Sequence, residues 1–167
     1  MKRNRTSYAG GQTGGKAQSR ASHSNRILVV DDEIAIRLLI SDALVRSGYH
    51  VDTAEDGEIG WEAIQSKSYD LLITDNNMPK VSGLELVKKL RSADLALPVI
   101  LVSGAIPTEE LNRNPGLQLS ATLPKPFTDH ELLGTVKKVL CKTDSTRAQD
   151  EPEPIWQSHR SVHSLPV

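Results

Sequence analysis

The chain has 167 residues, enough for one domain with a substantial core, and its 20 Lys and Arg residues nearly balance its 21 Asp and Glu residues. That balance excludes a general attraction to polyanions, and the single cysteine, Cys141, excludes an internal disulfide framework. The sequence contains no apolar run of signal-peptide or membrane-spanning length. These features predict a soluble cytoplasmic protein that makes no use of a membrane.

The two ends of the chain differ in composition from its middle. Residues 1–25 contain basic residues but no acidic one, are rich in Gly and Ser, and lack periodic apolar positions, so we predict a disordered basic N-terminal tail. The GGQTGGK run at 10–16 is rejected as a phosphate-binding loop, because no strand precedes it and no helical pattern follows. Residues 142–167 include an acidic, proline-containing spacer and are predicted to form a second disordered tail. A single folded domain is expected over 26–141.

The middle of the chain alternates short apolar runs with amphipathic helical stretches. Runs at 27–30, 50–54, 71–74, 99–102 and 121–123 are typical of strands, and the more polar second run indicates an edge strand. Four stretches with helical apolar spacing carry the expected buried stripes: Ile36, Leu39, Ile40, Ala43 and Leu44; Ile59, Ala63 and Ile64; Leu84, Val87 and Leu90; and Leu132, Val136, Val139 and Leu140.

Helix boundaries are marked by residues with known capping roles. Gly48 is expected to end the first helix, Asp56 to cap the second, and the Thr128-Asp129-His130-Glu131 run to open the last with a capping box. Between the fourth and fifth strands, prolines at 107 and 115 leave room only for a short helix at about 108–113.

Five strands alternating with helices predict an α/β fold with a doubly wound, five-stranded parallel sheet of the flavodoxin-like order 2-1-3-4-5. In this order the first and third strands are neighbours, about 4.8 Å apart. Asp31 and Asp32 follow the first strand and Asp75 ends the third. We therefore expect these carboxylates to meet in one crevice at the carboxyl edge of the sheet.

Neighbouring carboxylates need a compensating charge. A pair about 4 Å apart repels by about 4 kcal/mol at an effective dielectric constant of about 20, so a shared proton or a bound cation is expected. Oxygen ligands without His or Cys favour a hard divalent cation, Mg²⁺ before Ca²⁺. The Ser103 hydroxyl and the Lys125 ammonium follow the next two strands at the same edge. Together these groups would stabilise an incoming phosphoryl group, with Asp75 as the nucleophile that forms an aspartyl phosphate.

Four short motifs give this crevice a more specific interpretation. They occur in the order Asp31-Asp32-Glu33, DNNMPKVSG at 75–83, Ser103-Gly104 and Lys125-Pro126-Phe127. In order and spacing they resemble the receiver domain of two-component response regulators, over roughly residues 26–141.

The resemblance implies a function for each motif. Asp75 would accept a phosphoryl group from a phosphohistidine on a histidine kinase or a histidine phosphotransfer protein, and the domain would at most catalyse its own phosphorylation and dephosphorylation. The other implied roles are Mg²⁺ binding by Asp32, Asp75 and the backbone carbonyl of Asn77, with Asp31 contributing through water, and phosphoryl binding by Ser103 and Lys125. Ser103 would move inward once phosphate is present.

Two features set limits on the output of such a domain. Receivers of this family usually carry an aromatic residue three positions before the lysine, where this chain has Thr122. Thr122 and the helix-breaking Pro115 together predict an unusual or weakly switching output face. Neither tail contains a DNA-binding helix-turn-helix pattern, so we expect a stand-alone receiver that signals by protein–protein binding. The alternatives are a receiver-like binding module that is never phosphorylated, and an aspartate-nucleophile phosphatase of the haloacid dehalogenase type, whose Asp-x-Asp pattern the run at 31–33 does not match.

Overall fold

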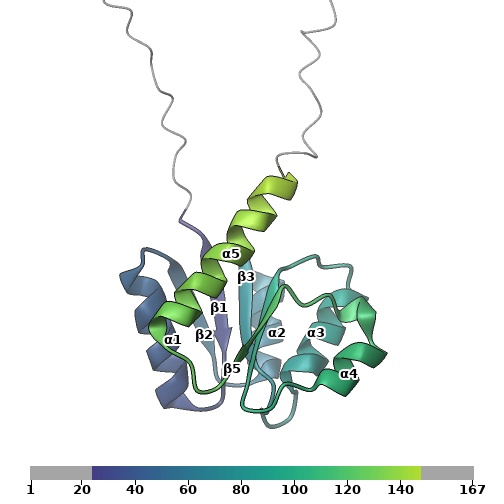
Figure 1. Cartoon of the computed structure of the whole chain (residues 1–167). Helices are drawn as coiled ribbons and strands as arrows, with labels where there is room; N and C mark the ends of the chain where they lie inside the picture. The colour runs from purple at the N-terminus through teal and green to yellow at the C-terminus, as the bar shows by residue number, and fades with distance from the viewer. Residues whose placement is uncertain (1–23, 148–167) are drawn as a thin grey trace, which may run out of the picture.

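The computed structural model describes residues 24–147 (Figure 1). Of the two predicted tails, only residues 24, 25 and 142–147 are among the described residues, and the rejected phosphate-loop run lies outside them. The strands are β1 (Arg26–Val30), β2 (His50–Ala54), β3 (Leu71–Asp75), β4 (Val99–Ser103) and β5 (Ala121–Pro124). The helices are α1 (Ile34–Arg46), α2 (Gly57–Ser66), α3 (Gly83–Ser92), α4 (Thr108–Arg113) and α5 (Asp129–Arg147), with a 3-10 turn η1 (Pro115–Leu117).

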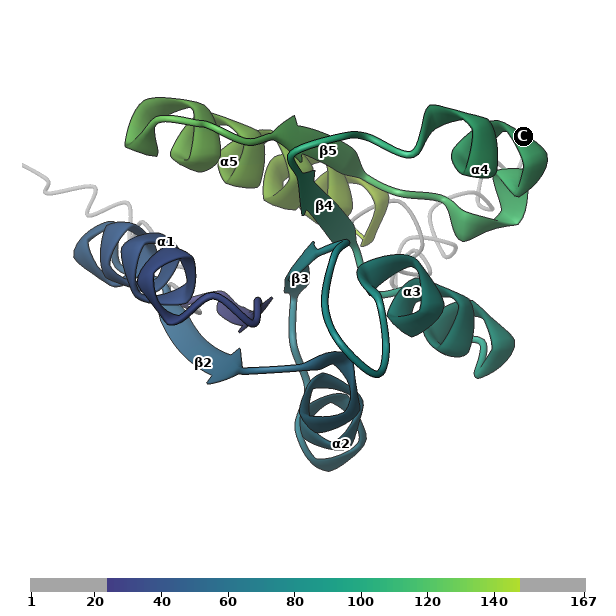
Figure 2. The ribbon, with the colours of Figure 1, turned by 90° about the horizontal axis from the view of Figure 1, so that it is seen from below.

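The five strands form one parallel sheet in the order β2-β1-β3-β4-β5, which confirms the predicted fold class. Helices α1 and α5 cover one face of the sheet, and α2 and α3 cover the other (Figure 2). Side chains of β1 alternate between the two cores: Ile27 and Val29 pack with α1 and α5, whereas Leu28 and Val30 pack with α2 and α3. Burial on both faces explains why the inner strands are continuous apolar runs.

The predicted capping residues form their expected hydrogen bonds. The carboxylate of Asp56 accepts the backbone N–H groups of Glu58 and Ile59, both at 2.9 Å. Thr128 and Glu131 form a reciprocal capping box at the start of α5. Gly48 follows the end of α1 with φ 89, a backbone conformation that glycine adopts without steric cost.

Two residues assigned to buried stripes are exposed instead. The exposed fraction is 45% for Leu39 and 39% for Ile59. Leu39 lies on the flank of α1, because Ile40, Ala43 and Leu44 make the contact with the sheet. Helix α2 approaches the sheet through Gly60, where an added Cβ would lie 3.0 Å from Val30 Cγ2, and this turns Ile59 toward the rim.

Helix α5 is longer than the predicted domain. It continues to Arg147, six residues past the boundary predicted at Cys141. The sequence has no proline or glycine between Cys141 and Arg147 that would end the helix, although its apolar stripe stops at Leu140. In Figure 1 this end of α5 rises beyond the sheet. None of the helices within 24–147 is long and apolar enough to cross a bilayer.

The segment between β4 and β5 contains the short α4 that the prolines predict, and it is attached to α3. Lys88 Nζ on α3 lies 2.8 Å from Glu110 Oε1 on α4. Arg91 on α3 donates to the carbonyls of Leu117 (3.0 Å) and Gln118 (3.2 Å) at and just after η1, and also to those of Leu95 and Leu97.

Replacing Arg91 by Met is expected to lower the free energy of unfolding by about 2 kcal/mol, because carbonyls that accept from a charged donor lose that donor. Urea unfolding of the purified chain measures the loss. Lys88→Met is the matched control: its pair with Glu110 is exposed and should contribute less than about 1 kcal/mol. Equal losses in the two variants would contradict the role given to Arg91.

Candidate functional site

The ends of β1 and β3 bring two aspartates together at the carboxyl edge of the sheet. The two strands pair in parallel with Val30 opposite Thr74, so Asp31 and Asp75, the next residues, emerge side by side. Both are buried, with exposed fractions of 1% and 4%. Of the three aspartates expected in one crevice, the structure brings Asp31 and Asp75 together.

Lys125 supplies the positive charge between these carboxylates. Its Nζ lies 2.8 Å from Asp75 Oδ1 and 3.0 Å from Asp31 Oδ2, and the side chain is only 18% exposed. The Lys125 backbone N–H donates to the Ser103 carbonyl at 2.9 Å, which fixes the start of the β5–α5 loop against the end of β4. Lys125 Nζ also lies 3.6 Å from Oε1 of Glu33, whose side chain is exposed.

The pKa values reflect this crowding of charge. Burial raises the pKa of Asp31, and the hydrogen bonds from Lys125 and from the Glu33 N–H only partly offset that effect. The neighbouring charge of Asp75 raises the Asp31 pKa further. Burial acts to lower the pKa of Lys125, but the hydrogen bonds and charges of Asp75 and Asp31 raise it overall. Lys125 is therefore fully charged at neutral pH.

The loop after β3 wraps around Asp75. The Asn77 N–H donates to Asp75 Oδ2 in a short hydrogen bond, and the Asn76 N–H donates to the Val102 carbonyl at 3.1 Å. The loop ends at Gly83, where an added Cβ would lie 2.2 Å from the Asp75 carbonyl oxygen. Glycine is thus needed at this position, a requirement that the sequence indicates only by placing Gly83 directly after the helix cap Ser82.

Ser103 lies at the end of β4, next to β3, but its hydroxyl is engaged locally. Ser103 Oγ donates to the Ala105 carbonyl at 2.8 Å and accepts from the Ala105 N–H at 3.3 Å, and the residue is fully buried. The structure therefore places the hydroxyl at the predicted edge of the sheet without a hydrogen bond to Asp75. Thr122, on β5, is exposed.

The predicted metal ligands do not form a closed cluster. Within residues 24–147, no group of three or more His, Cys, Asp or Glu side chains is arranged to hold a metal ion. Asp32 is exposed, whereas Asp31 and Asp75 both face Lys125. The donor chemistry nevertheless suits Mg²⁺, because these three carboxylates offer only oxygen ligands, which this hard cation prefers.

Comparison with known proteins agrees with this geometry. The five-stranded parallel sheet in this order places the chain in the fold class of receiver domains. The family model for the response regulator receiver domain matches residues 27–137, and the chain belongs to this family.

Curated relatives include the alkaline phosphatase synthesis transcriptional regulatory protein PhoP of Bacillus subtilis, 35% identical over 130 residues that cover 77% of this chain and 53% of the relative. The CpxR homolog of Haemophilus influenzae is 37% identical over 125 residues, which cover 72% of this chain and 52% of the relative. The chain thus spans about half the length of the curated relatives it matches.

Solved structures with the same fold include two bacterial regulators. The chemotaxis regulator CheY4 of Vibrio cholerae has a TM-score of 0.65 at 32% identity, over 69% of this chain and 98% of that one. The response regulator TrrA of Thermotoga maritima, in complex with Mg²⁺ and BeF, has a TM-score of 0.62 at 36% identity, with the same two coverages.

Proposed function

We propose that this receiver domain accepts a phosphoryl group on Asp75 from a phosphohistidine of a histidine kinase or a histidine phosphotransfer protein. The observation that carries the proposal is the 2.8 Å contact between Lys125 Nζ and Asp75 Oδ1, next to the second buried carboxylate of Asp31. A lysine beside a buried nucleophilic carboxylate stabilises the charge that develops on a transferred phosphoryl group.

The transfer step follows from this arrangement. A carboxylate oxygen of Asp75 attacks the phosphorus atom while the phosphorus–nitrogen bond to the donor histidine breaks, and that bond's electron pair stays on the imidazole nitrogen. The product is an acyl phosphate on Asp75. Lys125 then pairs with a phosphoryl oxygen, and the Ser103 hydroxyl reaches another by exchanging its hydrogen bond with Ala105.

Mg²⁺ would be held by Asp31, Asp32, Asp75 and the backbone carbonyl of Asn77, and it would neutralise negative charge on the phosphoryl oxygens. The Mg²⁺–BeF complex of the related TrrA supports this choice of cation. We further propose that the phosphorylated domain signals by binding another protein.

Acetyl phosphate with Mg²⁺ tests the proposal, with intact mass as the measurement. We expect the wild-type chain to gain one phosphate, and expect no gain after Asp75→Asn or in the presence of EDTA. A wild type that stays unmodified would favour the binding module that is never phosphorylated. Continuous hydrolysis of a phosphomonoester that is lost in Asp31→Asn but kept in Asp75→Asn would favour the phosphatase.

A further inference from the structure

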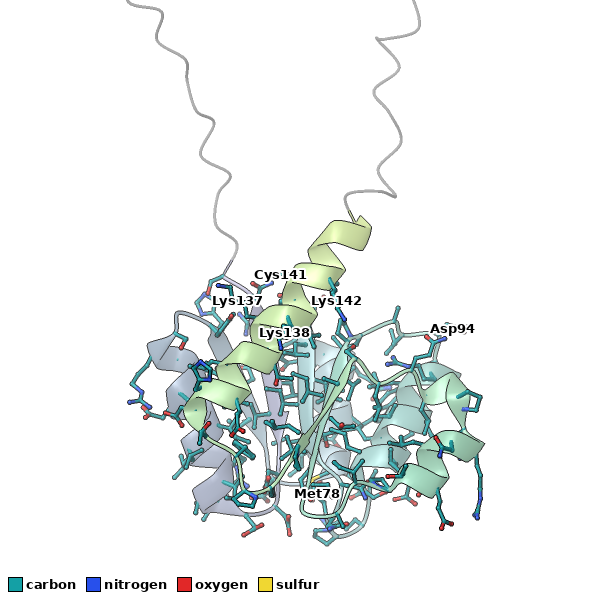
Figure 3. All side chains as sticks on the ribbon, in the orientation of Figure 1. Met78, Asp94, Lys137, Lys138, Cys141 and Lys142 are labelled. Carbon is teal, nitrogen blue, oxygen red and sulfur yellow. The ribbon has the colours of Figure 1, made fainter. Side chains whose placement is uncertain are left out.

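The loop between β3 and α3, residues 76–82, carries the Asn77 backbone and is fixed at both ends. At its start the Asn76 N–H donates to the Val102 carbonyl, and at its end the Gly83 and Leu84 N–H groups, both at 3.3 Å, return to the backbone carbonyl and side chain of Asn76. Between these ends, Met78 and Val81, each 8% exposed, pack into the core that faces α2 and α3, and the Val81 N–H donates to the Pro79 carbonyl at 2.8 Å. In Figure 3 Met78 lies at the carboxyl edge of the sheet.

Lys80, an exposed residue between the buried Met78 and Val81, adds an ion pair with α2. Lys80 Nζ lies 2.6 Å from Asp56 Oδ2, and the other carboxylate oxygen of Asp56 caps α2. The Asp56 side chain is 5% exposed, so its position is determined by the helix end, whereas the Lys80 side chain is 58% exposed and reaches in from solvent. Glu58 lies 4.0 Å from the same ammonium, which adds to the attraction.

Backbone geometry shows that the loop is pressed against α2 at this point. A Cβ on Gly57 would lie 2.5 Å from the carbonyl oxygen of Val81, so helix and loop are in backbone contact. Lys80 itself has φ 65, in the left-handed region that residues other than glycine adopt at an energetic cost. Such a conformation persists where surrounding contacts enforce it, and the Asp56 pair is the contact made by this side chain.

We propose that Lys80 is a positioning residue, which latches the loop of residues 76–82 to Asp56 at the start of α2 and so holds the Asn77 backbone beside Asp75. The role in phosphorylation rests on the proposed function of Asp75; the latch itself does not. An ordinary surface ion pair would affect overall stability only. A latch affects the loop locally, and through it the rate at which Asp75 is phosphorylated.

Hydrogen exchange of the metal-free, unphosphorylated chain, followed by NMR, tests the latch directly. The reporters are the N–H groups of Asn77, Val81 and Gly83, which are hydrogen-bonded within or next to the loop. In Lys80→Met we expect these amides to exchange about threefold to fivefold faster, with no change in α5. Lys80→Arg should retain wild-type exchange. Lys137→Met, which removes the same charge from an exposed site on α5, is the control and should leave the loop unchanged.

A double-mutant cycle isolates the pair. Asp56→Asn keeps an oxygen that can cap α2 but removes the charge, and it should speed loop exchange as Lys80→Met does, with little further effect when the two are combined. About 0.5 M NaCl should bring wild-type exchange toward the Lys80→Met value, because the pair is reached from solvent.

The acetyl phosphate reaction with Mg²⁺ then measures positioning. We expect Lys80→Met to be labelled about threefold to fivefold more slowly than wild type, and Lys80→Arg to be labelled normally. Unchanged loop exchange in Lys80→Met, or faster exchange that extends equally to α5, would overturn the latch. Faster loop exchange with an unchanged labelling rate would overturn the positioning role. If the wild type itself were not labelled, the proposed function would fail, and the exchange experiment would still decide the latch.

Discussion

Replacing Lys125 by Met is expected to lower the free energy of unfolding of the metal-free chain by about 2–3 kcal/mol at neutral pH, below the usual loss for one partner of a buried pair. The substitution leaves Asp31 and Asp75 buried next to each other without their shared cation. The loss is reduced because each carboxylate keeps a backbone donor, from Glu33 and Asn77 respectively. Chemical denaturation with and without Mg²⁺ measures it, and Mg²⁺ should stabilise the variant more than the wild type.

The pH dependence of this loss has a definite sign. The hydrogen bond from Lys125 lowers the pKa of Asp31, so removing it raises an already raised pKa further. At a pH between the Asp31 pKa of the folded wild type and that of the folded variant, the folded variant binds more protons than the folded wild type. Lowering the pH therefore stabilises the folded variant relative to the wild type. The gap in stability should therefore narrow as pH falls through these values and be largest above them. A gap that widened toward acid pH would contradict the assignment of Lys125 as the counter-charge.

Gly83→Ala is expected to cost about 3 kcal/mol of unfolding free energy, at the upper end of the range for overpacking. The added Cβ would lie 2.2 Å from the carbonyl oxygen of Asp75 and 3.0 Å from its carbonyl carbon. Because the obstacle is backbone, either α3 or the end of β3 must move. We therefore expect slower phosphorylation of Asp75 in addition to the stability loss, measured by urea unfolding and acetyl phosphate labelling.

Gly134→Ala is the matched control for this substitution. Gly134 lies inside α5, and an added Cβ there would have no atom within 4 Å. Removing a glycine from a helix interior should raise the free energy of unfolding by up to about 1 kcal/mol. If the two alanine variants changed stability in the same direction, the close contact at Gly83 would not be the cause.

The sequence was sufficient to predict the parts of the site that depend on strand order. Asp31 and Asp75 end neighbouring strands, and the alternation of strands and helices was enough to predict that neighbourhood. Lys125 follows β5, two strands beyond β3 in the same sheet, and its place at the carboxyl edge follows from the same argument. These predictions rest on topology, which a few rules of chain connection restrict strongly.

The parts that the sequence did not predict depend on close approach and side-chain direction. Ile59 has the spacing of a buried residue, but α2 contacts β1 through Gly60, so the Ile59 side chain does not face the sheet. The Ser103 hydroxyl is at the predicted position, yet its local bonds to Ala105 are not encoded in any pattern. Lys80 and Asp56 are 24 residues apart in the chain, and no sequence pattern predicts their ion pair or the left-handed backbone of Lys80.

The attachment of α4 and η1 to α3 has a mechanical consequence. Arg91 and Lys88 join these three elements into one body, and α3 begins at Gly83 in contact with the carbonyl of Asp75. A displacement of the Asp75 backbone would therefore move α3, α4 and η1 together rather than α4 alone. A protein bound to the outer surface of α3 would respond to this displacement, and the response would not require an aromatic side chain at the position of Thr122.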